Sequence, residues 1–124
     1  MKHKQLLAFC RSLPQVTEDV KWGADLVFSI GGKMFAAFDV KGGPGYSFKA
    51  TPENFAMLTK QDGIIPAPYA ARFHWVSVVV PTALPVAAAK ELIAESYRLV
   101  AAKLPAKVRQ KLGHDTALET RPKE

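Results

Sequence analysis

The sequence contains a single cysteine, Cys10, among its 124 residues, so no disulfide can form within the chain. This scarcity suits a reducing compartment. No apolar run approaches the ~20 residues that a membrane-spanning helix needs. The basic, amphipathic start of the chain has no long apolar stretch followed by a small-residue cleavage site. We therefore expect a cytoplasmic protein without membrane contact.

Motifs for catalysis and metal binding are also missing. The three histidines, His3, His74 and His114, form no ligand pair of helical spacing. No serine stands in a Gly-x-Ser-x-Gly turn, and the glycine-rich segment 41–45 lacks the Gly-Lys-Ser/Thr ending of a phosphate loop. Cys10 falls on the apolar side of an expected helix, where a thiol is buried and inert. We expect no catalytic residue, no metal and no cofactor.

Acidic residues are few relative to basic ones. Lysine and arginine total 17 against 11 aspartates and glutamates, which gives a formal charge of +6. Such an excess attracts polyanions such as DNA. It is equally typical of a surface whose charge only keeps the protein soluble, so both interpretations stay open.

The periodicity of apolar residues predicts a mixed order of elements. We expect a helix, three strands, a helix, one or two strands and a last long helix. The expected helices cover residues 3–13, a short segment starting at Thr51-Pro52, and residues 86–104, with one or two further turns over 106–112. The expected strands cover residues 26–30, 33–40, 46–50 and 74–80, and residues 61–73 form a loop.

This order predicts an α+β fold of two layers, with helices on one face of an antiparallel sheet. The length fits one domain over residues 1–113. Residues 114–124 have no apolar periodicity and are expected to form a flexible tail.

Hairpin turns at 31–32 and 41–45 assign the strand residues to two faces, because directly paired residues point the same way. The face expected under the helices holds Val27, Met34, Ala36, Phe38, Val40, Tyr46, Phe48 and Ala50, with Val76, Val78 and Val80. The other face mixes aromatic and basic side chains: Leu26, Phe28, Ile30, Lys33, Phe35, Ala37, Asp39, Ser47 and Lys49, with Trp75 and Ser77.

Four stretches, taken in order, resemble the MmcQ/YjbR family. They are residues 13–18 (LPQVTE) leading to Trp22-Gly23, residues 26–36 (LVFSIGGKMFA), residues 63–66 (GIIP) followed by 72–76 (RFHWV), and residues 91–100 (ELIAESYRLV). The resemblance covers about residues 5–105. The nearest matches to shared family positions are Trp22, Lys33, Phe35, His74 and Trp75.

The resemblance implies an α+β fold like that of secretion chaperones and frataxin-like proteins. It also implies DNA binding through a double-wing element. A frataxin-like iron role would need a dense carboxylate ridge, which the scattered acidic residues do not supply.

The residues and the resemblance together predict a non-enzymatic protein that binds DNA through its basic and aromatic sheet face. Aromatic rings stack on bases and ammonium groups neutralise phosphates. The candidate nucleic-acid-binding residues are Lys33, Phe35, Lys49, Arg72, His74 and Trp75.

Two alternatives stay open. The same face could bind a protein partner, as a chaperone-like dimeric module, or be covered by the 61–73 loop or by a second copy of the chain. An enzyme would instead show a deep pocket with titratable groups around His74 and Tyr69.

Overall fold

The computed structural model describes residues 3–21, 25–39, 45–68 and 70–112. Residues 113–124, together with Trp22, Val40 and Tyr69, lie outside the described residues. The predictions made for them, the flexible tail included, therefore stay predictions.

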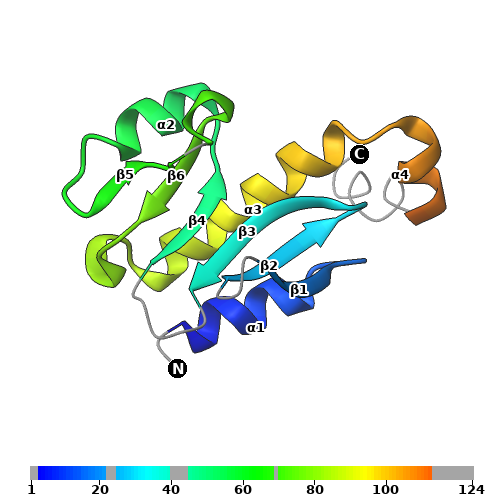
Figure 1. Cartoon of the computed structure of the whole chain (residues 1–124), viewed down its shortest axis with the longest axis horizontal. Coiled ribbons are helices and arrows are strands. Elements are labelled where there is room, and N and C mark those ends of the chain that lie inside the picture. The colour runs from blue at the N-terminus through cyan, green and yellow to red at the C-terminus, as the bar shows by residue number, and fades with distance from the viewer. Residues whose placement is uncertain (1–2, 22–24, 40–44, 69, 113–124) are drawn as a thin grey trace.

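A six-stranded antiparallel sheet forms one layer of the molecule (Figure 1). Its strand order is β1-β2-β3-β4-β6-β5. The strands are β1 (Thr17–Lys21), β2 (Asp25–Ile30), β3 (Lys33–Asp39), β4 (Tyr46–Lys49), β5 (Ile64–Pro66) and β6 (Trp75–Val78).

The helices form the second layer. They are α1 (Lys4–Ser12), α2 (Pro52–Leu58), α3 (Val86–Ala102) and α4 (Ala106–Leu112), with short 3-10 turns η1 (Ala71–Phe73) and η2 (Pro81–Ala83). The long helix α3 crosses behind β3 and β4 in Figure 1 and packs against both. Helix α1 packs on α3, and α2 is joined to α3 by the side-chain amide of Asn54, which donates to Glu95 at 3.0 Å. The predicted two-layer α+β fold is confirmed.

The helix cap and the hairpin turn expected from the sequence are both present. The Thr51 hydroxyl accepts a hydrogen bond from the backbone amide of Asn54 at 3.1 Å and caps α2, with Pro52 in its first turn. Gly31 and Gly32 both have positive φ, +60° and +82°, which glycine adopts at little cost in a tight hairpin turn.

Strand β1 was not predicted, and β5, the second of the one or two strands expected before the last helix, was not located. All five residues of β1 are exposed, so this edge strand has no buried face to produce an apolar alternation. Strand β5 has only three residues and falls within the expected 61–73 loop. Strand β1 is stabilised by pairing with β2, and β5 by pairing with β6. This pairing between segments cannot be predicted from a local sequence pattern.

The predicted assignment of faces is partly wrong because β3 contains a bulge. Ser29 pairs with Met34, but Phe28 pairs with Ala36, so Phe35 is an extra residue without a partner in β2. The bulge breaks the simple alternation, and Phe35 and Ala36 are both fully buried. The hydroxyl of Ser96 on α3 donates to the Phe35 carbonyl at 2.7 Å, which places this segment under the helix.

The core therefore draws on residues from both predicted faces. The confirmed members are Ala36, Phe38, Tyr46, Phe48, Ala50, Val76 and Val78, while Leu26, Phe28, Ile30 and Phe35, predicted on the other face, also belong to the core.

Three of the predicted core residues are misassigned. Val27 is buried as predicted but pairs with Ala37, and Met34 lies in a groove, so both are on the face opposite the helices. Val80 follows the end of β6 and is exposed. The β3–β4 register also differs from the predicted one by two residues, pairing Phe38 with Tyr46, which leaves the faces of these strands unchanged.

Candidate functional site

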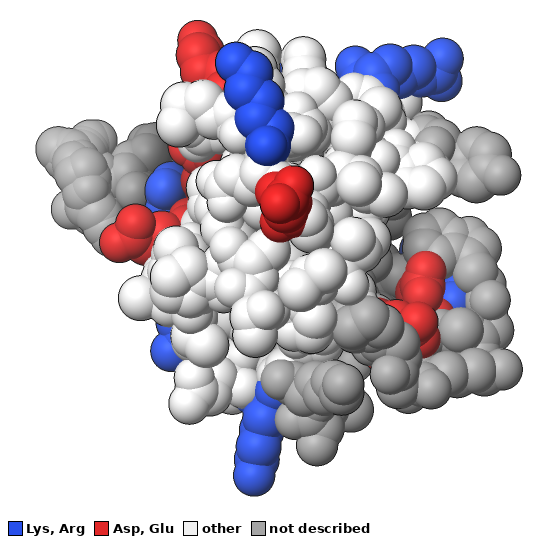
Figure 2. All heavy atoms as spheres, turned by 90° about the vertical axis from the view of Figure 1, so that its left-hand side faces the viewer, with Lys and Arg blue, Asp and Glu red and all other residues white. Residues whose placement is uncertain are grey.

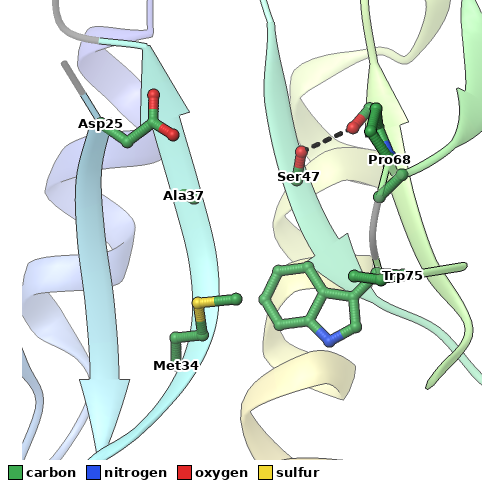
Figure 3. A pocket seen from close by; sticks show the side chains of 9 residues that line it. Asp25, Met34, Ala37, Ser47, Pro68 and Trp75 are labelled. Carbon is green, nitrogen blue, oxygen red and sulfur yellow. Dashed lines mark hydrogen bonds between the residues drawn. The ribbon is translucent and has the colours of Figure 1, made fainter. Parts of the chain in front are cut away.

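The sheet face away from α3 carries a groove of about 630 Å³ (Figure 3). Strands β2, β3, β4 and β6 form its floor, and the segment after β5 forms one wall. Its lining is mostly apolar: Asp25, Met34, Ala37, Ser47, Ala67, Pro68, Ala70, Trp75 and Ser77. The predicted placement on the open face is confirmed for Ala37, Ser47, Trp75 and Ser77.

The floor of the groove combines one aromatic ring with small side chains. In Figure 3, Met34 and the indole of Trp75 point toward each other across the groove. Between them and Asp25 lie Ala37 and Ser47, whose small side chains keep the floor open. Two hydroxyls, Ser47 Oγ and Ser77 Oγ, form a hydrogen bond with each other at 2.8 Å. An apolar floor with few polar groups is typical of a binding site rather than of a solvated sheet face.

The wall of the groove is fixed by backbone hydrogen bonds. The Ala67 amide donates to the Trp75 carbonyl at 3.0 Å, and the Trp75 amide donates to the Ala70 carbonyl at 3.3 Å. Of the expected cover from the 61–73 loop, the described residues Ala67, Pro68 and Ala70 border one side of the open face. Val27 and Ser29, which lie on the same face of β2, are also buried.

A carboxylate stands at the far end of the groove from Trp75. Asp25 is partly buried at the start of β2, and its cross-strand neighbour on β3 is Asp39. Burial, and secondarily the charge of Asp39, raise the pKa of the Asp25 carboxyl above its usual value. This end of the face is acidic, which opposes phosphate binding there.

Basic side chains gather instead around an exposed aromatic ring in η1. Phe73 is 49% exposed. The Arg72 guanidinium carbon lies 4.8 Å from the ring centroid, and Lys49 Nζ lies 5.9 Å from it and donates to the Phe73 carbonyl at 2.9 Å. Partial burial, and then the positive charge of Lys103 at the end of α3, lower the pKa of Lys49. We call Lys49, Arg72, Phe73 and Lys103 the basic cluster.

Of the other predicted nucleic-acid residues, Trp75 lies directly opposite Lys49 in the β4–β6 pairing, whereas Lys33 and His74 take other places. Lys33 is exposed beside the β2–β3 turn, and no hydrogen bond, ion pair or ring contact joins it to the basic cluster within the described part of the chain. His74 adopts a left-handed backbone with φ +66° and its ring packs edge-on against Phe55 of α2, 5.5 Å away between centroids. His74 therefore caps η1 and packs against α2, outside the groove lining.

The expectation that Phe35 offers a stacking surface is wrong. Its side chain is fully buried, and its ring packs edge-on against Tyr97 of α3 at 5.2 Å. Trp75 is only 6% exposed and is part of the groove floor rather than an open platform. Neither ring is free to stack on a base in this arrangement.

Three further expectations concern chemistry and the membrane. Cys10 is fully buried, as predicted, and burial raises the pKa of its thiol to about 12, so it stays protonated. Among the described residues, no group of three or more histidines, cysteines and acids could hold a metal ion. No helix in the described ranges is both long and apolar enough to cross a membrane.

Sequence reasoning missed three residues that shape these sites. Asp25 was not singled out, because a single acid before an apolar strand is common at a strand end. Met34 was assigned to the wrong face because the sequence does not reveal the bulge. Phe73 lay in the expected loop, although its position directly after Arg72 and before His74 could have drawn attention to it.

Comparisons with known proteins agree with this fold. The protein DR2400 of Deinococcus radiodurans, described as a DUF419 domain, superposes with a TM-score of 0.77 at 29% identity, over 89% of this chain and 86% of that one. A Pseudomonas syringae protein superposes with a TM-score of 0.65 at 22% identity, over 81% of this chain and 99% of that one, and shows the fold alone. No curated protein is significantly similar to the sequence. The family model named YjbR matches residues 11–99, and the chain therefore belongs to the YjbR family.

Proposed function

We propose that this protein is a non-enzymatic binding protein that holds an extended segment of a protein partner in the groove on its open sheet face. The observation that carries this proposal is the groove itself, about 630 Å³ in volume and lined mainly by apolar side chains around Trp75. An aromatic ring in an apolar depression is the usual anchor point of a protein interface. The small residues Ala37, Ser47 and Ser77 leave room for partner side chains on the floor.

An enzymatic role has less support. Among the described residues of the groove lining, Asp25 has the one titratable side chain, and no nucleophile lies beside a base. Ser47 and Ser77 on its floor are hydrogen-bonded to each other, and the part of the lining that the structure describes contains no histidine. A binding role without catalysis therefore accounts better for this groove.

Filling the groove should abolish partner binding and leave the fold intact. We expect heptapeptides selected from a phage-displayed random library to bind the wild type and to bind the Ala37→Phe variant about tenfold more weakly or worse, because the new ring occupies the floor. Fluorescence anisotropy with the synthesised peptides measures both affinities. Phenylalanine is a favourable strand residue, so the variant should keep its melting temperature.

The matched control is Ala87→Phe, which adds the same ring at an exposed position of α3. This control should bind the peptides as the wild type does. Selected peptides that bind wild type, Ala37→Phe and Ala87→Phe equally well would show that the groove is not the binding site.

Nucleic-acid binding is a second candidate, supported by the basic cluster rather than by the sheet face. Among the described residues, no carboxylate forms an ion pair with Lys49, Arg72 or Lys103, so their charges remain available to an anion. Phe73 offers an exposed ring between two of these cations. On the side of the molecule in Figure 2, however, lysine and arginine side chains are separated by wide uncharged surface and stand among acidic ones. The basic cluster itself has three cations, so its footprint would be small and the binding weak.

This second candidate makes a salt-dependent prediction. Labelled single-stranded and duplex oligonucleotides should bind with a Kd of roughly micromolar or weaker at physiological salt. The double variant Lys49→Gln, Arg72→Gln should flatten the slope of log K against log salt by about two units, one for each phosphate-binding cation removed. The double variant Lys4→Gln, Lys90→Gln, with an equal reduction of charge on α1 and the first half of α3, should keep the wild-type slope. Equal slopes for the two double variants would remove the basic cluster as the site.

A further inference from the structure

The groove has two chemically different ends. At one end Met34 and Trp75 face each other, and at the other the Asp25 carboxylate stands beyond Ala37 (Figure 3). Within the described part of the chain, no cation forms an ion pair with Asp25. Its cross-strand neighbours are Lys21 on β1 and Asp39 on β3. Lys21 is exposed, and its ammonium group lies outside ion-pairing distance of Asp25.

The ionised Asp25 carboxylate does not stabilise the fold of the isolated protein. Burial of the carboxylate and the neighbouring charge of Asp39 both disfavour its ionised form, since its pKa is raised in the folded state. Neutral asparagine would avoid both costs in the same space. A charge that the fold disfavours, at the end of an apolar groove, is typical of a functional site.

We propose that the groove selects a partner segment that carries a lysine or arginine side chain beside an apolar one. The apolar side chain packs between Met34 and Trp75, and the cation meets Asp25. This inference rests on the proposed partner-binding function and adds the chemistry of the partner. The aliphatic stem of lysine or arginine suits the floor at Ala37, because such stems lie along apolar surface while the charged head reaches out. Charge complementarity across an interface of this kind chiefly confers specificity.

Selection from the random heptapeptide library provides the first test. Heptapeptides recovered with the wild type should be enriched in lysine and arginine relative to the unselected library. Heptapeptides recovered with Asp25→Asn should lack this enrichment and keep their apolar residues. The control Asp62→Asn, which removes an exposed charge from the turn before β5, should give the wild-type result.

A direct test replaces the cation of one selected peptide by its neutral isostere. The arginine peptide should bind the wild type about fivefold tighter than the citrulline peptide, the upper range for a partly exposed charge pair. The Asp25→Asn variant should bind the two peptides equally. Its melting temperature should be unchanged or higher, because the replaced carboxylate is disfavoured in the folded protein, so a failure to discriminate cannot be ascribed to unfolding.

The outcomes separate this inference from the proposed function. If the two peptides bind the wild type equally and Ala37→Phe weakens both, the groove binds peptides and the charge preference is wrong. If Ala37→Phe leaves both affinities unchanged, or if no peptide is recovered, the groove is not a peptide site and the inference falls with it.

Discussion

The Phe35→Ala variant should reduce the free energy of unfolding by about 3–5 kcal/mol, the range for emptying an aromatic core position. The Phe35 ring is fully buried and packs against Tyr97 at 5.2 Å and Phe28 at 6.5 Å between centroids. The bulge fixes this ring between β3 and α3, so neighbouring side chains cannot easily close the cavity. Urea denaturation followed by circular dichroism measures the reduction.

The matched control is Phe73→Ala, the same chemical change at a ring that is 49% exposed. Its destabilisation should stay below about 1 kcal/mol, as for most surface substitutions. Phe38→Ala should resemble Phe35→Ala, because Phe38 is 3% exposed in the same core. A small effect of Phe35→Ala together with a large one of Phe38→Ala would favour the face assignment predicted from the simple alternation.

The Ser96→Ala variant should destabilise the protein by about 2–4 kcal/mol, although it removes one oxygen atom. The fully buried hydroxyl of Ser96 donates to the Phe35 carbonyl at 2.7 Å and accepts from the Lys49 amide at 2.9 Å. Alanine leaves both backbone groups without this partner, and each unsatisfied buried group costs about 1–3 kcal/mol. Denaturant melts of the variant and the wild type measure the difference.

Ser12→Ala is the control for this second substitution. The Ser12 hydroxyl donates to the Phe9 carbonyl at 2.6 Å, but the residue is exposed, so water can replace this hydrogen bond. The destabilisation should be a few tenths of a kcal/mol at most. Similar effects of Ser12→Ala and Ser96→Ala would mean that the Ser96 hydrogen bonds do not hold α3 to the sheet.

The candidate sites could be predicted only in part. The sequence correctly placed Ala37, Ser47, Trp75 and Ser77 on one open face, because alternation is regular in β4 and β6 and in the part of β3 that follows the bulge. It did not reveal that this face is acidic at Asp25, nor that Lys49 and Arg72 meet at Phe73. These groupings depend on how strands and turns far apart in the chain are packed, which no local pattern encodes.

The sequence by itself determined the layer architecture, the turn at Gly31-Gly32, the cap of α2 and the amphipathic helix α3. Each of these depends on contacts within a few residues or on apolar periodicity, which are properties of the local chain. Only the tertiary structure decided the bulge at Phe35 and the strands β1 and β5. The bulge is stable because Ser96, 61 positions along the chain, bonds the carbonyl of the extra residue, and the two edge strands are stable because a neighbouring strand pairs with them.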